Sequence, residues 1–266
     1  MPALSPDDQL LLAALEAGGA RVRVAQWRGP VLEDAVAVVR SCWDYAADPV
    51  GFLDACAGWS AAGRLLNPLE TIRWNLDKRY LGELAAAGVE MPETVHVPAD
   101  APRSLAEVIA DLGGGEVVVK PCVGASGIGA WRSADPGDPR WHEGAGVDRL
   151  VQRFVPGVVE DGELSLTWFR DGYSHAVRKR VRAGEFRVQE EHGGTVEIAH
   201  PDRGIVAAAE RVLAAVSHDW WYARVDGVVE RGRFLLMELE LVEPELFFRW
   251  GEGSAARLAR LLRTVA

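Results

Sequence analysis

The sequence predicts a mixed fold, in which a small parallel α/β unit is followed by two α+β units. Two observations indicate this. Helix and strand patterns alternate up to about residue 67, whereas strand patterns dominate from about residue 150 onward. Alternation is typical of an open parallel sheet, and runs of strands favour a separate, strand-rich unit. We therefore expect units at 1–67, 68–155 and 156–266.

The first unit begins with a helix where a strand is usual. Ser5-Pro6 is a typical helix start, because serine caps free N–H groups and proline suits the first helical position. Gly18-Gly19 ends that helix. Strands are expected at 21–27, 35–40 and 65–66, with a helix at 49–61. Too few residues precede Ser5 for a central strand, so we expect that the unit lacks its first strand or that the native start lies upstream.

The later units are predicted from the same patterns of apolar residues. In the second unit, helices are expected at 75–87 and 104–112, strands at 94–97 and 116–121, and an exposed loop at 133–146. From residue 150 onward, strands are expected at 150–155, 164–170, 173–180, 221–229 and 233–239, and helices at 203–216 and 253–264.

The composition argues against several classes of function. The net charge of −10, without a concentrated basic face, argues against a nucleic-acid partner. The three cysteines have no metal-binding or redox spacing, and their odd number fits a reducing cytoplasm. No apolar run reaches the length of a membrane span. We expect a cytoplasmic protein that binds neither nucleic acid nor membrane; its oligomeric state is open, with a homodimer as one candidate.

Three carboxylates on two neighbouring strands are the most informative chemical feature. Strand alternation puts Arg224 and Asp226 on one face of the first strand, and Glu238 and Glu240 on one face of the second. Carboxylates among apolar neighbours are costly unless a cation neutralises them. Oxygen ligands without cysteine or histidine nearby favour Mg²⁺ or Mn²⁺, which usually also bind substrate phosphates.

A glycine-rich tip follows Lys120, which lies at the end of an apolar strand. The tip is Gly124-Ala125-Ser126-Gly127-Ile128-Gly129. Glycine lets backbone N–H groups approach phosphate oxygens, and a lysine adds positive charge there. The spacing is not that of a GxxxxGK[ST] loop, so an ordinary turn explains this segment equally well by itself. Lys78, early in its helix, and the strand end at Gln152-Arg153-Phe154-Val155 also have simple structural explanations when taken alone.

Together and in this order, these elements resemble the ATP-grasp superfamily, over about residues 67–246. The nearest resemblance is to glutathione-synthetase-like members. Within these, Arg40-Ser41-Cys42-Trp43-Asp44-Tyr45, the segment 74–81 and Glu238-Leu239-Glu240-Leu241 are similar to the D-cycloserine-forming (O-ureidoserine) cyclo-ligases. The resemblance implies an ATP-grasp fold, in which two α+β subdomains clamp ATP beneath a small N-terminal subdomain.

The resemblance also implies roles for the matched residues. Metal ligands are expected at Asp226, Glu238 and Glu240, and Arg224 is expected to stabilise the negative charge that develops during catalysis. The residues expected to bind the nucleotide are Lys78, Lys120, Gly124, Ser126, Gly127, Gly129, Gln152, Phe154, Val155, Glu160 and Glu163.

Two further pairs of residues are candidates for contacts with phosphate or substrate. Lys179 and Arg187 bring positive charge into an acidic chain and are expected to act in catalysis by facing the γ-phosphate or a substrate carboxylate. The alternative for this pair is a solvated hairpin. Arg40 and Ser41 follow the C-terminal end of a strand, where open α/β sheets bind ligands. They are expected to contact the substrate, and a structural corner is the alternative.

The implied function is an ATP- and Mg²⁺-dependent ligase. Phosphoryl transfer to a small amino-acid-like carboxylate would give an acyl phosphate, and an amine in the same or another molecule would then attack it. Two alternatives stay open: a nucleotide-binding module without catalysis, and a kinase with the same fold. The sequence does not identify the carboxylate or the amine.

Overall fold

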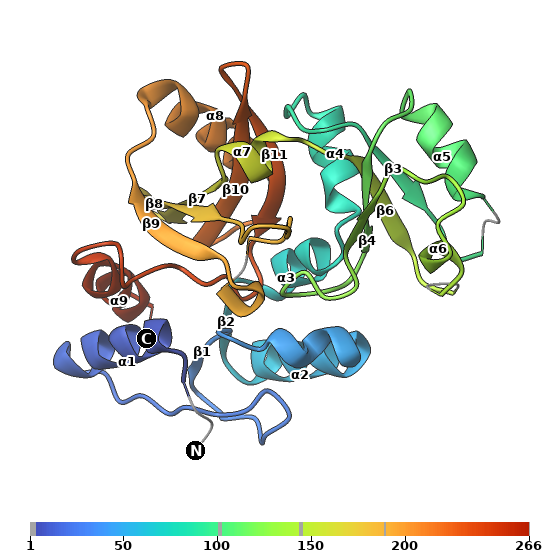
Figure 1. The fold of residues 1–266 in the computed structure, drawn as a ribbon. Coiled ribbons are helices and arrows are strands. Elements are labelled where there is room, and N and C mark those ends of the chain that lie inside the picture. The colour runs from blue at the N-terminus through green and yellow to red at the C-terminus, as the bar shows by residue number, and fades with distance from the viewer. Residues whose placement is uncertain (1–3, 101–102, 144–145, 189, 266) are drawn as a thin grey trace.

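The computed structural model describes residues 4–100, 103–143, 146–188 and 190–265, and the strands of these segments form three sheets. A two-stranded parallel sheet pairs β1 (Val36–Val38) with β2 (Arg64–Leu66). A four-stranded sheet has the order β3-β6-β4-β5, and a five-stranded sheet has the order β11-β10-β7-β8-β9. The two larger sheets lie side by side, and the small sheet lies below them in Figure 1.

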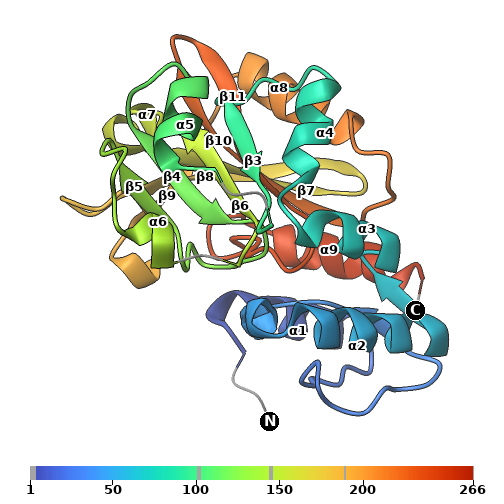
Figure 2. The ribbon, with the colours of Figure 1, turned by 90° about the vertical axis from the view of Figure 1, so that its right-hand side faces the viewer.

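The N-terminal layer combines the small sheet with α1 (Pro6–Ala17) and α2 (Pro49–Ala62). The Ser5 hydroxyl caps α1 by accepting a hydrogen bond from the Asp8 N–H at 3.1 Å. Helix α1 packs against the C-terminal helix α9 (Ser254–Arg263), and together they bury Leu11, Leu258 and Leu262 (Figure 2). The two ends of the described chain therefore share one apolar cluster.

Buried hydrogen bonds fix this layer to the five-stranded sheet. The Tyr222 hydroxyl donates to the carbonyls of Val39 and Leu66, at 2.9 and 3.0 Å. The Asn67 side-chain amide donates to the carbonyls of Tyr222 and Leu241, at 2.9 and 2.7 Å. Because all these groups are buried, each bond satisfies a polar atom that water does not reach.

The four-stranded sheet contains β3 (Thr94–Val97), β6 (Arg149–Arg153), β4 (Val117–Pro121) and β5 (Trp131–Ser133), with every pairing antiparallel. Helix α5 (Leu105–Asp111) begins with a capping box formed by Ser104 and Glu107. It packs on the sheet through a cluster that includes Val108, Val117 and Val151. The short helix α6 (Arg140–Glu143) follows β5.

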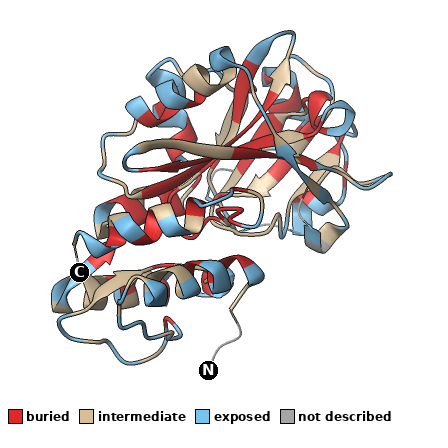
Figure 3. Cartoon of the chain, turned by 90° about the vertical axis from the view of Figure 1, so that its left-hand side faces the viewer, coloured by how far each residue is buried: buried red, intermediate tan, exposed pale blue. Residues whose placement is uncertain are grey.

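The five-stranded sheet is also antiparallel, and its strands are β7 (Glu163–Phe169), β8 (Gly172–Arg180), β9 (Thr195–Ala199), β10 (Tyr222–Glu230) and β11 (Arg233–Glu240). Its core includes residues of α4 (Tyr80–Ala86) and α8 (Arg203–Ala214), among them Leu84 and Leu213. Figure 3 shows the buried residues concentrated on the strands, with exposed residues on the outer faces of the helices.

Three predicted elements differ from the structure. Residues 21–27 form no strand; the segment is irregular and ends in a turn, where the Trp27 indole donates to Asp44 at 2.7 Å. The predicted helix at 75–87 is two helices, α3 (Leu69–Leu76) and α4, because the Lys78 N–H donates to the Cys122 carbonyl at 2.8 Å instead of continuing a helix. The predicted loop at 133–146 contains α6.

One strand was missed by the sequence analysis. Strand β9 lies at the edge of the five-stranded sheet, where Thr195 and Glu197 are exposed, so its apolar alternation is weak. Two short elements, the 3₁₀ helix η1 (Trp43–Ala47) and α7 (Gly157–Glu160), also had no sequence signal. The expectation of a missing first strand or an upstream start concerns residues 1–3, which lie outside the described residues. Among the helices of the described segments, none is long and apolar enough to cross a membrane.

Candidate active site

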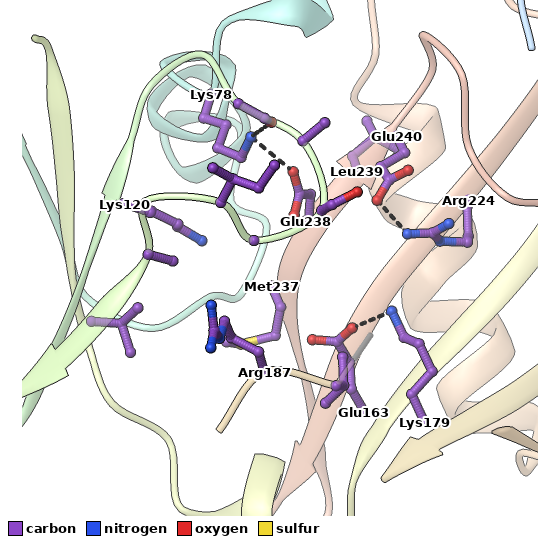
Figure 4. A pocket seen from close by; sticks show the side chains of 18 of the residues that line it. Lys78, Lys120, Glu163, Lys179, Arg187, Arg224, Met237, Glu238, Leu239 and Glu240 are labelled. Carbon is purple, nitrogen blue, oxygen red and sulfur yellow. Dashed lines mark hydrogen bonds and ion pairs between the residues drawn. The ribbon is translucent and has the colours of Figure 1, made fainter. Parts of the chain in front are cut away.

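A cavity lies between the two larger sheets and is closed on one side by the N-terminal layer. Strands β4 and β6 and the glycine-rich tip form one wall, and strands β8, β10 and β11 form the opposite wall. Trp43 and Tyr45 of η1 complete the lining. Figure 4 shows the side chains of Lys78, Lys120, Arg187 and Glu238 turned toward this space.

Lys78 reaches the cavity because it lies in the break between α3 and α4. Its Nζ donates to the Gly124 carbonyl at 2.6 Å and forms an ion pair with Glu238 at 3.2 Å. One lysine thus contacts both the glycine-rich tip and strand β11 (Figure 4). A continuous helix through this segment, as predicted from the sequence, would not have freed the backbone N–H of Lys78 for its bond to Cys122.

Lys120 is a half-buried cation near the end of β4. Its Nζ lies 3.3 Å from the Gln152 Oε1, and no carboxylate of the described residues lies within ion-pairing distance. Burial and the neighbouring Lys78 lower the pKa of Lys120, although Glu238 opposes the shift. A lysine in this environment is stabilised when an anion enters the cavity.

The glycine-rich tip has left-handed backbone conformations and lines the cavity. Ser126, Gly127 and Gly129 have positive φ angles of 54°, 64° and 76°. Gly124, Ser126 and Gly127 line the cavity, whereas Gly129 does not. His192, in the loop between β8 and β9, lies with its Nε2 3.1 Å from the Ser126 carbonyl, so a second loop contacts the tip.

The predicted hinge residues lie together at the end of β6. Gln152, Phe154 and Val155 all line the cavity. Gln152 is buried, and its Nε2 donates to the Thr94 hydroxyl at 3.0 Å. The Arg132 guanidinium stacks on the Phe154 ring, 4.6 Å from its centroid. This corner therefore offers apolar surface, with backbone groups at its edge, which suits a planar heterocycle.

The strand register assembles a network of charges beside the cavity. Arg224 pairs with Glu240 and Asp226 pairs with Glu238 across β10 and β11. The Arg224 Nη2 lies 2.8 Å from Asp226 and also contacts Glu240. Lys179 contacts Glu163 at 2.6 Å and Asp226 at 3.1 Å. This register confirms the prediction that the four residues at 224, 226, 238 and 240 lie together.

Asp226 and Glu240, the two carboxyl groups that contact Arg224, have pKa values shifted in opposite directions. Burial alone would raise the pKa of Asp226, but Arg224 and Lys179 outweigh it and hold that pKa below its ordinary value. For Glu240, burial raises the pKa to about 7, and the Asp226 and Glu238 carboxylates add to this against the effect of Arg224. Glu240 therefore lacks enough positive charge, whereas at Glu238 the charges of Lys78 and Lys120 outweigh burial and lower the pKa.

The three predicted metal ligands differ in their access to the cavity. Asp226 is 2% exposed, does not line the cavity, and is occupied by Arg224 and Lys179. Within the described segments, no group of three acidic, histidine or cysteine side chains is arranged to hold a metal ion. Glu238 and Glu240 do line the cavity. Two carboxylates suit Mg²⁺, which is commonly held by one or two protein carboxylates together with substrate phosphates.

The structure does not bring every predicted site residue to the cavity. Glu163 and Arg187 line the cavity. Arg187 also pairs with Glu185 at 2.8 Å. Glu160, in α7, is outside the lining. Lys179 lines the cavity from β8. Arg40 and Ser41 are outside the lining and both bind Asp8 of α1, with an Arg40 Nε–Asp8 distance of 2.8 Å.

Several lining residues were not assigned to the site from the sequence. Trp43, Tyr45 and Glu243 are among them, and all three line the cavity. The sequence held one signal for Glu243, since it follows Glu238 and Glu240 closely along the chain. Because Glu243 lies past the end of β11, it is not part of the strand alternation that indicated Glu238 and Glu240.

Comparison with known proteins places this geometry in a family. Residues 1–67 match a family model described as the N-terminal domain of D-cycloserine synthetase DcsG. The chain is 33% identical to the cycloserine biosynthesis protein DcsG of Streptomyces lavendulae over 274 residues, which cover 95% of this chain and 91% of that protein.

Two solved structures show the same fold. The crystal structure of D-cycloserine synthetase DcsG superimposes with a TM-score of 0.85 at 29% identity, covering 98% of this chain and 95% of that one. The ATP-grasp ligase PsnB, complexed with a phosphomimetic variant of its minimal precursor, Mg and ADP, superimposes with a TM-score of 0.67 at 17% identity, covering 98% and 96%. The predicted fold class is thereby confirmed.

Proposed function

The chain belongs to the ATP-grasp ligase family that includes DcsG, and from this premise we propose that it is an ATP- and magnesium-dependent ligase of antibiotic biosynthesis. Its substrate is a small amino-acid-like carboxylate, which it activates as an acyl phosphate before a C–N bond forms. One observation carries the proposal: the half-buried Lys120, which pairs with no carboxylate of the described residues, and a glycine-rich tip lie across one cavity from Arg224 and two carboxylates.

Binding of ATP follows from the two walls of the cavity. Lys78, Lys120 and the backbone N–H groups of the tip bind the phosphates, and adenine lies at the corner formed by Gln152, Phe154 and Val155. Glu238 and Glu240 would hold Mg²⁺, which neutralises phosphate charge and polarises the γ-phosphoryl group. Lys78 would then exchange its ion pair with Glu238 for a phosphate contact.

The proposed reaction has two steps. A substrate carboxylate oxygen attacks the γ-phosphorus of ATP, the bond from that phosphorus to the β-phosphate oxygen breaks, and ADP leaves. A nitrogen then attacks the acyl carbon, the bond to the phosphate oxygen breaks, and the nitrogen loses a proton as inorganic phosphate departs. Arg224 lies where it can stabilise negative charge on the transferring group, and its two carboxylate contacts hold the guanidinium in place.

Family membership supports an intramolecular second step. In that form of the reaction the nucleophilic nitrogen and the activated carboxylate belong to one molecule, so a ring forms. The cavity then needs to hold only one small substrate beside the nucleotide, and proximity supplies much of the rate.

The proposal is tested by measuring ADP release with each enantiomer of O-ureidoserine, with and without hydroxylamine. ADP release together with a cyclised product is expected, and hydroxylamine should divert part of the acyl phosphate to a hydroxamate. A stable phosphorylated product would indicate a kinase instead. ATP binding without turnover of any amino-acid-like carboxylate would contradict the ligase assignment.

A further inference from the structure

Glu243 differs from every other acidic side chain that lines the cavity within the described residues. Each of the others forms an ion pair: Glu163 with Lys179, Glu238 with Lys78, Glu240 with Arg224, and both Glu190 and Glu245 with Arg249. Glu243 is 6% exposed, and its side chain has neither an ion pair nor a hydrogen bond with any described residue.

A carboxylate in this position is costly unless a ligand satisfies it. Removing an ionised carboxylate from water without a partner costs several kcal/mol, so such groups are expected to meet a cation in the functional complex. Burial and the nearby Glu240 raise the pKa of Glu243 well above its ordinary value, which is the response of an acid that lacks a counter-ion. A bound cation would reverse that shift.

The protein cations that act on Glu243 through space are Arg224, Arg40 and Lys78, and each is already committed elsewhere. Arg40 binds Asp8 through its Nε at 2.8 Å and donates from its Nη1 to the Pro244 carbonyl at 2.6 Å, and Lys78 pairs with Glu238. Arg224 is occupied by Asp226 and Glu240. The cation for Glu243 therefore has to come from outside the described chain.

The surroundings of Glu243 favour an organic ammonium over a metal ion. Trp43 and Tyr45 line the cavity with it, and burial together with the charge of Glu243 raises the pKa of Tyr45. Aromatic rings and one carboxylate suit an ammonium group. A divalent cation needs several oxygen ligands, and among the described residues Glu243 belongs to no group of three acidic, histidine or cysteine side chains that could hold one.

We propose that Glu243, beside Trp43 and Tyr45, binds the α-ammonium group of an α-amino acid substrate, an inference that rests on the ligase function proposed above. Arg224 contacts Glu240, and both residues line the cavity together with Glu243 and act on the pKa of Glu243 through space. A substrate whose carboxylate lies toward Arg224 would carry its ammonium group on the adjacent carbon, toward Glu243. The subsite selects amino acids over carboxylates that lack the amine.

The test compares substrates with and without the amine in the presence of Mg²⁺ and a non-hydrolysable ATP analogue. The pairs are O-ureidoserine, serine and alanine, in both enantiomers, against the same acids with hydrogen in place of the α-amino group. Calorimetry should show that the wild-type protein binds at least one amino acid about 10- to 100-fold more tightly than its deamino partner, as expected for a buried charge-assisted hydrogen bond.

The variant Glu243→Gln should lose that preference while binding the deamino acids and the ATP analogue as the wild type does. Glu243→Asp keeps the charge and should keep part of the preference, which separates charge from folding. Glu210→Gln, an exposed substitution on α8, is the matched control.

Three outcomes would overturn the subsite: no preference for the amine in the wild type, equal weakening of both members of each pair in Glu243→Gln, or a higher Mg²⁺ requirement in that variant. Hydroxamate formation from deamino acids alone would overturn the subsite but leave the ligase function standing. If the protein prefers the amino acids in a way that depends on Glu243 but forms no hydroxamate, the subsite would stand and the ligase function would be overturned.

Discussion

Two buried arginine–aspartate pairs, Arg40–Asp8 and Arg224–Asp226, look alike locally but lie in different surroundings. Their side chains are 10% and 4% exposed in the first pair, and 9% and 3% in the second. Arg224 also contacts Glu240 and lines the cavity. Arg40 instead donates to the Pro244 carbonyl, and Asp8 accepts from the Ser41 hydroxyl.

The comparison teaches that burial and pairing do not by themselves identify a functional arginine. Arg40 connects α1, the end of β1 and the segment after β11, so it holds the N-terminal layer against the rest of the molecule. Arg224 has a comparable partner but also faces a space that a ligand can enter. Access to the cavity is the feature that separates the two, and it supports a structural role for Arg40 over the predicted substrate contact.

The largest expected effect concerns Arg40→Ala. Removing one partner of a buried pair leaves Asp8 uncompensated, which should lower the free energy of unfolding by about 3–5 kcal/mol. Urea denaturation measures this change, and Arg28→Ala, whose pair with Asp44 is exposed, should cost less than about 1 kcal/mol. If Arg40→Ala instead raises the KM for the carboxylate substrate at unchanged stability, Arg40 is a substrate contact after all.

The next effect concerns Arg224→Ala. We expect kcat to fall by about 100- to 1000-fold, because a group that stabilises charge in the transition state is lost. ATP affinity should stay close to that of the wild type, and Lys179 still compensates Asp226 in the variant. Steady-state ADP release and nucleotide titration measure the two quantities. An equal loss in both would contradict a specific role in catalysis.

A smaller effect is expected for Lys120→Ala. The variant loses a charge-assisted contact with phosphate, so the Kd for ATP should rise by about 10- to 100-fold. Arg180→Ala is a suitable control, since that exposed arginine pairs with Glu197 and does not line the cavity. Nucleotide titration of both variants decides the matter: unchanged ATP affinity in Lys120→Ala would remove this lysine from the phosphate site.

The smallest effect is a pH dependence of stability at the Arg40–Asp8 pair. Burial opposes ionisation of Asp8, but Arg40 and the hydroxyls of Ser41 and Ser5 hold its pKa below the ordinary 3.8. The pair therefore stabilises the fold above that pH, and its contribution is lost as the pH falls through the lowered pKa. Asp8→Asn should be less stable than the wild type near neutral pH, with a gap that narrows in acid. A gap of constant size in urea denaturation across this range would contradict the assignment.

Much of the cavity's chemistry could be predicted from local sequence patterns. Strand alternation placed Arg224, Asp226, Glu238 and Glu240 together, and the observed register agrees. Positions where the chain leaves regular structure were harder. Lys78 lies in a helix break that depends on Cys122, and Glu243 follows the end of its strand. No local pattern predicts the bond between Lys78 and Cys122, because the two residues are distant in the sequence. No strand pattern predicts the place of Glu243, because it lies beyond the end of β11.

The sequence by itself determined most of the long helices and strands, the faces of the long strands and the pool of charged residues. These features follow from side-chain periodicity and from the backbone preferences of glycine and proline, which act over a few residues. Only the tertiary structure decided which charges compensate one another. It neutralised Asp226, turned Arg40 toward Asp8, and left Lys120 and Glu243 in the cavity without ionic partners among the described residues, because ion pairing and burial depend on elements that meet only in the folded chain.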